Sequence, residues 1–206
     1  MHIEFLVEEP SAEAALKNLV PRIVPEIEFK VITYQGKPDL LSKLPQRLKG
    51  YRRWIKNDWR IVVLIDKDRE DCEELKQKLE RFANDASLVT KTNAGKSAEF
   101  QVLNRISIEE LEAWFFGDVV ALHRAYPKIH LSLGTKSKYR DPDAILGGTW
   151  EALEKELQRK GYFHGGLAKI EAAKAISAHM DPARNRSKSF QVFRDGLIEM
   201  ANFSRS

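Results

Sequence analysis

The stretch Trp59–Cys72 (WRIVVLIDKDREDC) constrains the fold of this chain most strongly. Its first half is an almost unbroken run of isoleucine, valine and leucine, which is typical of a strand buried on both faces of a parallel sheet. Four acidic residues then follow within six positions: Asp66, Asp68, Glu70 and Asp71. In open α/β sheets, ligands bind outside the carboxyl ends of the strands, so these carboxylates mark a candidate site.

Asp66 and Asp68 are two residues apart, so on an extended chain their side chains point the same way. Two carboxylates about 4 Å apart repel by roughly 4 kcal/mol at an effective dielectric constant near 20, and a divalent cation would reverse the sign of that energy. The alternative interpretation is helix capping, with Asp68 or Glu70 at the N-terminus of the next helix. Capping accounts for one acidic residue but not for a DxD pattern at the end of a core strand.

Strand and helix patterns alternate through the first half of the chain. Ser11 is the expected N-cap of the first helix, and a break is expected in the second near Pro45 or Gly50. The β-α-β-α-β-α-β order predicts an α/β, Rossmann-like fold with a mostly parallel four-stranded sheet flanked by helices. Strands are expected at 3–7, 29–34, 60–65 and 100–108, and helices at 11–23, 40–55 and 72–86.

The character of the chain changes after Asp118. Three amphipathic helices are expected near the C-terminus, at 149–160, 167–180 and 190–200. We therefore expect an α/β domain over residues 1–118 and a helical extension over residues 119–206 that packs on it.

Composition limits the class of protein. The only cysteine is Cys72, which excludes an internal disulfide and a CxxC metal site and fits a reducing cytosol. The start MHIEFLVEEP lacks the features of a signal peptide, and no apolar run approaches the roughly 20 residues of a membrane span. We expect a cytoplasmic protein without a membrane partner. The net charge of +4 permits an anionic partner.

Acidic residues follow three of the expected strands. In a parallel sheet the carboxyl ends of the strands share one edge, so the three groups can converge there. Oxygen ligands without histidine or cysteine favour Mg²⁺ or Mn²⁺, and such a site suits phosphoryl transfer. For Glu109 and Glu112 the alternative is that they complement the dipole of the next helix. The three groups are Glu8 with Glu9, Asp66 with Asp68 and Asp71, and Glu109 with Glu110 and Glu112.

Basic residues near aromatic ones suggest a nucleic-acid partner. Trp54 and Trp59 are expected in the core, because aromatic side chains are usually buried. The neighbouring cations could offset phosphate charge beside an acidic site. The candidate nucleic-acid-binding residues are Arg52, Arg53, Lys136, Lys138 and Arg140.

Three segments, VEEPSAE (7–13), LIDKDREDC (64–72) and ISIEELEAW (106–114), resemble a Toprim-related family of unknown function often described as RloG-like. Toprim is the metal-binding α/β module of topoisomerases, primases and overcoming-lysogenization-defect nucleases. The segments DPDAILGGTWEAL (141–153) and NRSKSFQVF (185–193) are similar to the C-terminal half of that family. The resemblance thus extends over the whole chain and implies a Toprim-like sheet.

The Toprim pattern has a glutamate after the first strand and a DxD after the third. The resemblance therefore implies that Glu8, Asp66 and Asp68 are catalytic and bind the metal. Many family members carry a glycine after the first glutamate, where this chain has Glu9; we choose Glu8 because it directly follows the apolar strand. Further metal ligands implied by the resemblance are Asp71, Glu110 and Glu112.

The implied function is a Mg²⁺- or Mn²⁺-dependent nuclease acting on DNA or RNA, in phage defence or DNA processing, with a separately encoded ATPase as a possible partner. The alternative is a catalytically silent Toprim module that binds nucleic acid or such an ATPase. A haloacid-dehalogenase-like phosphatase is a weaker third hypothesis. In such phosphatases the DxD follows the first core strand, whereas in this chain it follows the third apolar run. The AGKS segment (94–97) is not expected to bind nucleotide, since Thr90 stands where a P-loop needs its first glycine.

Overall fold

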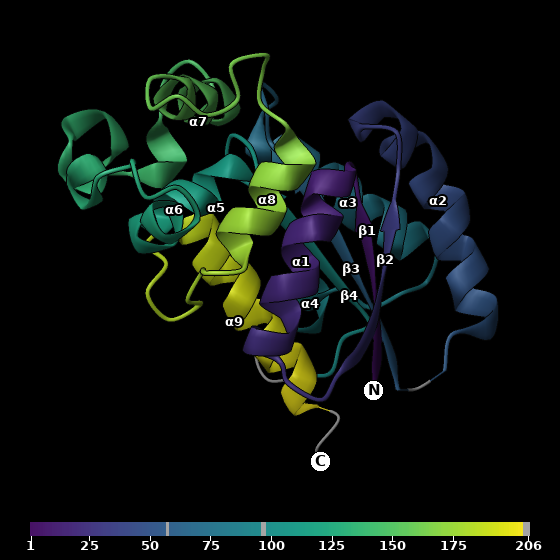
Figure 1. Ribbon diagram of the computed structural model, residues 1–206. Coiled ribbons are helices and arrows are strands. Elements are labelled where there is room, and N and C mark those ends of the chain that lie inside the picture. The colour runs from purple at the N-terminus through teal and green to yellow at the C-terminus, as the bar shows by residue number, and fades with distance from the viewer. Residues whose placement is uncertain (57, 96–97, 204–206) are drawn as a thin grey trace.

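The computed structural model describes residues 1–56, 58–95 and 98–203; Lys96 and Ser97 of the AGKS segment lie outside these residues. Its centre is a four-stranded sheet in the order β2-β1-β3-β4, in which every pair of neighbours is parallel (Figure 1). The predicted α/β fold with a parallel sheet is confirmed. The strands are β1 (His2–Val7), β2 (Glu28–Thr33), β3 (Trp59–Asp66) and β4 (Val102–Ser107).

Helices cover both faces of the sheet. On one face lie α2 (Lys37–Trp54) and α3 (Cys72–Asp85), and on the other lie α1 (Pro10–Ile23) and α9 (Lys188–Asn202) (Figure 1). Alternate residues of β3 belong to the two hydrophobic clusters on opposite faces: Ile61, Val63 and Ile65 to one, Val62 and Leu64 to the other. This double burial explains the unbroken apolar run of β3.

The C-terminal helices share a hydrophobic core with the first strand and helix. Trp114 is fully buried, and its ring contacts Phe190 and Phe193 of α9. Helix α8 (Lys169–Ser177) packs along α1. The remaining elements are α4 (Lys91–Ala94), α5 (Glu112–Gly117), α6 (Val119–Ala125), α7 (Thr149–Gln158) and short 3-10 turns at Leu131–Thr135, Ser137–Tyr139 and Pro142–Ala144.

Two helix boundaries differ from the sequence prediction. Helix α1 begins at Pro10 with Glu9 as its N-cap residue, so Ser11 lies inside the first turn. Proline suits this first position because its missing N–H would have no partner within the helix. Helix α2 is continuous through Pro45 and Gly50, so the expected break is wrong. Its buried stripe of Leu40, Leu44, Leu48 and Tyr51 packs with the sheet, and that burial outweighs the local cost of proline and glycine.

The expected burial of Trp54 is also wrong, because 53% of this residue is exposed. It lies in the last turn of α2, where its ring contacts the buried ring of Tyr51 and that of Trp59. Within the described part of the chain, no helix is long and apolar enough to cross a membrane.

Candidate functional site

The ends of β1 and β3 meet at the carboxyl edge of the sheet. Glu8 follows β1 directly and is buried, with 8% of the residue exposed. Its Oε1 accepts a hydrogen bond from the backbone N–H of Asp66 at 2.6 Å. Burial raises the pKa of Glu8 to about 7, although that hydrogen bond and the charge of Lys37 act in the opposite direction. Glu8 therefore changes its protonation state near neutral pH.

Asp66 lies at the centre of the acidic group. Loss of hydration is the main reason that its pKa is raised well above the usual value, and the charges of four other carboxylates raise it further: Glu8, Glu112, Asp68 and Glu110. The three acidic segments predicted from the sequence thus come within electrostatic range of one aspartate. Their convergence follows from the parallel sheet, which places the ends of β1, β3 and β4 side by side.

Glu112 is the most deeply buried carboxylate of this group, with 3% of the residue exposed. It occupies the first turn of α5, and burial raises its pKa to about 7. The charge of Lys169 lowers that pKa, whereas Glu110 raises it. A buried acid with a pKa near neutrality is a frequent feature of functional sites.

Lys37 joins the acidic group from the N-terminus of α2. Its Nζ lies 2.7 Å from Oδ2 of Asp68 and 3.1 Å from Oε1 of Glu70, and it donates a hydrogen bond to the carbonyl oxygen of Lys67 at 3.1 Å. Burial alone would lower the pKa of this amine, but its carboxylate partners outweigh that effect and raise the pKa. Lys37 therefore remains charged and holds the loop that carries Asp68.

A second lysine, Lys169, approaches from the first turn of α8. Its Nζ lies 3.9 Å from Oε2 of Glu9 and 5.2 Å from the centre of the Trp150 ring. Burial acts to lower its pKa, but the carboxylates of Glu112 and Glu9 raise it overall. Two ammonium groups thus lie within electrostatic range of the carboxylates, Lys37 near Asp68 and Lys169 near Glu9 and Glu112.

Two of the predicted metal ligands act as helix caps. Asp71 is the N-cap residue of α3, where its Oδ1 accepts hydrogen bonds from the N–H groups of Glu73 and Glu74 at 2.9 Å. Oε2 of Glu110 accepts three hydrogen bonds at the start of α7: 2.9 Å from the Thr149 N–H, 2.8 Å from its hydroxyl and 2.9 Å from the Trp150 N–H. Capping thus accounts for both carboxylates, and their role as metal ligands stays a prediction.

Two of the predicted nucleic-acid residues lie far from the carboxylates. Arg52 and Arg53 are exposed in the last turn of α2, whereas Lys37 at the start of the same helix contacts Asp68. An 18-residue helix is about 27 Å long, so this pair lies at the opposite end of the sheet. The other three cations are exposed in the segment before α7: Lys136, Lys138 and Arg140.

The donor chemistry of the site fits a divalent cation. Burial raises the pKa of Asp66 most, and the charges of the neighbouring carboxylates raise it further; a cation would relieve that repulsion. Glu8, Asp66 and Asp68 would hold Mg²⁺ or Mn²⁺, with Glu112 beside them. Among residues 1–56, 58–95 and 98–203, no three acidic, histidine or cysteine side chains are already arranged as metal ligands.

The two lysines are the site residues that sequence reasoning missed. Lys37 stands between Gly36 and Pro38, in a segment with the local signature of a loop. One signal was available, because the proline marks the first turn of a helix and the preceding strand ends at the same edge of the sheet as Asp66. For Lys169 the sequence offers no comparable signal, since α8 reaches the site through its packing on α1, α5 and α6.

Comparison with curated proteins and with solved structures gives no match. The resemblance to Toprim-related proteins therefore remains a prediction from the sequence segments. A family model described as a domain of unknown function, DUF4276, matches residues 7–198, and the chain belongs to this family.

Proposed function

We propose that this chain is a Mg²⁺- or Mn²⁺-dependent nuclease of the Toprim type that cleaves phosphodiester bonds in DNA or RNA. The observation that carries the proposal is the convergence of Glu8, Glu112, Asp68 and Glu110 on Asp66 at the carboxyl edge of a parallel sheet. This edge is where open α/β sheets bind their ligands. A bound divalent cation would supply charge stabilisation for the reacting phosphate.

Side chains of the site would supply proton transfer and further charge stabilisation. Glu8 has a pKa of about 7 and holds the Asp66 N–H through Oε1, so its Oε2 is suited to accept a proton from an attacking water molecule. Lys37 carries a fixed positive charge beside Asp68, which offsets negative charge at the site. Lys169 provides a second positive charge, near Glu112 and Glu9.

One observation favours the alternative, a catalytically silent module that binds nucleic acid or a separately encoded ATPase. Lys37 already pairs with Asp68 and Glu70, so an internal cation compensates part of the acidic charge. A site stabilised in this way does not require a metal ion for folding. A measurement of metal binding by the purified chain distinguishes the nuclease from the silent module.

The test is calorimetric titration of the full chain with Mg²⁺ and with Mn²⁺, beside the variant Asp66→Asn/Asp68→Asn. The matched control is Asp85→Asn, which changes an exposed aspartate at the end of α3. The nuclease proposal expects binding by the wild type and the control, and loss of binding in the double variant. Metal-dependent cleavage of single- or double-stranded DNA or RNA should follow the same pattern.

Absence of both binding and cleavage in the wild type would contradict the nuclease and support the silent module. Cleavage that persists undiminished in the double variant would show that these aspartates are not the reacting site.

A further inference from the structure

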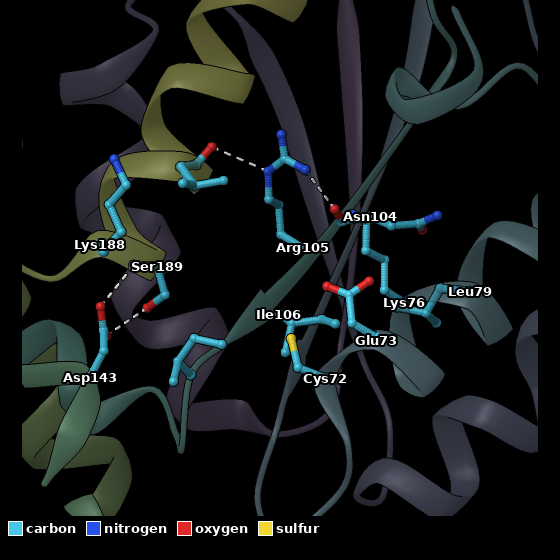
Figure 2. A pocket seen from close by; sticks show the side chains of 12 residues that line it. Cys72, Glu73, Lys76, Leu79, Asn104, Arg105, Ile106, Asp143, Lys188 and Ser189 are labelled. Atoms are coloured by element: carbon cyan, nitrogen blue, oxygen red, sulfur yellow. Dashed lines mark hydrogen bonds between the residues drawn. The ribbon is translucent and has the colours of Figure 1, made fainter.

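The outer edge of β4 forms the floor of a pocket of about 330 Å³ (Figure 2). Strand β4 is the last strand of the sheet; it pairs with β3 on its inner side, and on its outer side it forms an isolated parallel bridge between Val102 and Thr90. One wall of the pocket is α3, which contributes Lys76 and Leu79, and the other is α9, which contributes Lys188 and Val192. The pocket is therefore a groove between two helices with a strand edge at its base.

The backbone of β4 presents hydrogen-bonding groups to this groove. The Ile61 N–H donates to the carbonyl oxygen of Gln101, and the Lys67 N–H donates to that of Ser107. Because backbone groups alternate in direction along a strand, odd-numbered residues of β4 face β3 and even-numbered residues face outward. Asn104 and Ile106 therefore turn their main-chain groups toward the groove.

Part of this edge is already covered. The Val102 N–H donates to the carbonyl oxygen of Val89, and Nη1 of Arg105 donates to the carbonyl oxygen of Asn104 at 2.8 Å. Three main-chain groups of this edge are not hydrogen-bonded in this way: the N–H of Asn104 and the N–H and C=O of Ile106. No other group in the described residues pairs with them.

The Asn104 side chain adds an acceptor to the groove wall. Its Nδ2 donates to Oε1 of Glu80 at 2.9 Å, whereas its Oδ1 is buried and has no partner within the described part of the chain. Only 8% of this residue is exposed. A buried acceptor without a donor is unfavourable, so a ligand that supplies an N–H there gains binding energy.

The charge of the groove is positive on balance. Lys76, Arg105 and Lys188 line it, together with Glu73 and Asp143. The Asp143 carboxylate already accepts hydrogen bonds from the Ser187 hydroxyl and from the N–H and hydroxyl of Ser189; Figure 2 shows those from Ser189. A ligand with negative charge therefore complements this surface better than a neutral or basic one.

We propose that the outer edge of β4 binds an extended, acidic peptide segment of a partner protein, which adds to the sheet as a strand beside β4. Main-chain groups spaced along a strand edge are matched by another main chain, and this is the basis of recognition by strand addition. The aliphatic side chain of Val192, which is 42% exposed, would contact an apolar residue of the segment, and Lys76 and Lys188 would contact its acidic ones.

The test begins with selection of random eight-residue peptides displayed on phage against the full chain. Selected peptides are synthesised and their binding is measured by fluorescence anisotropy. The groove variant is Val192→Glu, and its control is Ile198→Glu; the two residues are 42% and 41% exposed and lie on the same helix. Binding should weaken by about tenfold or more in the groove variant and in Lys76→Glu/Lys188→Glu, and remain unchanged in the control.

Amide hydrogen exchange identifies the mode of binding. The bound peptide should slow exchange at the N–H groups of Asn104 and Ile106, while the N–H of Arg105, which faces β3, exchanges as before. Failure to select any peptide, or binding that does not protect these two amides, would overturn the proposal. Protection of the same amides by an oligonucleotide, or by self-association of the chain that Val192→Glu abolishes, would assign the groove to that occupant instead.

Discussion

The Glu8 carboxylate accepts a hydrogen bond from the backbone N–H of Asp66 at 2.6 Å, so a side chain joins the ends of β1 and β3 where their ladder stops. The same contact places a titratable group with a pKa of about 7 beside the central aspartate. The protonation state of Glu8 therefore affects both this backbone hydrogen bond and the charge beside Asp66. Several measurable properties follow from this arrangement and from the charges around it.

Protonation of Glu112 should control stability between about pH 4.5 and pH 7. Its pKa rises from 4.5 to about 7 on folding, so the folded state binds the proton more tightly. The contribution of Glu112 to the free energy of unfolding is fully present below its pKa in the unfolded state. It is lost as the pH rises through its pKa in the folded state. The shift corresponds to about 3 kcal/mol. Urea unfolding in EDTA should show that Glu112→Gln stabilises the protein at pH 8 but not at pH 4.5.

The control for this prediction is Glu151→Gln, which changes an exposed glutamate in the first turn of α7. It should leave the pH dependence of unfolding as in the wild type. Equal pH dependence of wild type and Glu112→Gln would show that Glu112 does not titrate in this range.

Loss of Lys37 should destabilise the fold and make it more responsive to Mg²⁺. In Lys37→Met the carboxylates of Asp68 and Glu70 lose a buried cation, at a cost of about 1–3 kcal/mol given that both acids are partly exposed. Thermal unfolding should show a larger rise in Tm on addition of Mg²⁺ than in the wild type. Lys43→Met removes an exposed lysine of the same helix and should change neither value.

Asp71 provides a test of capping against metal binding. Asp71→Ala should cost about 1 kcal/mol of stability, whereas Asp71→Ser keeps a side-chain acceptor and should cost little. Neither change should alter the stabilisation by Mg²⁺ if the residue acts as a cap. A serine variant that is as stable as the wild type but no longer responds to Mg²⁺ would identify Asp71 as a ligand.

Glu110 should contribute to stability through α7. Glu110→Ala leaves two backbone N–H groups and the Thr149 hydroxyl without their acceptor, which should cost about 1–3 kcal/mol in chemical unfolding. Glu109→Ala removes a solvent-accessible ion pair with Lys67 and should cost less. Equal losses in the two variants would contradict the anchoring role of Glu110.

The basic residues at the end of α2, Arg52 and Arg53, should contribute to the affinity for nucleic acid but not to the cleavage step. The double variant Arg52→Glu/Arg53→Glu changes the end of α2 farthest from Asp68, so it should lower affinity without altering the cleavage rate at saturation. Its effect should shrink as salt is added, because phosphate contacts release counterions. Affinity of oligonucleotides at several salt concentrations measures this, with Lys136→Glu/Lys138→Glu for comparison. An unchanged affinity would remove Arg52 and Arg53 from the interface.

The sequence by itself determined the order of strands and helices, the parallel sheet and the position of the acidic segments at its carboxyl edge. These follow from local pattern. The apolar run Ile61–Ile65 is buried on both faces only if helices cover both faces of the sheet, and the residues after it then lie at the end of the strand. The burial of Trp54 and the break in α2 were mispredicted, because both depend on which helix face meets the sheet.

Only the tertiary structure decided which charges meet. Lys37 and Lys169 come from helices that are 132 positions apart in the chain, and their packing brings both to the carboxylates around Asp66. Tertiary structure likewise assigned Glu110 to the start of α7 and left the outer edge of β4 only partly covered. Local pattern fixes the direction of each element, whereas contacts between distant elements depend on how their surfaces pack, which a single sequence does not encode in any short segment.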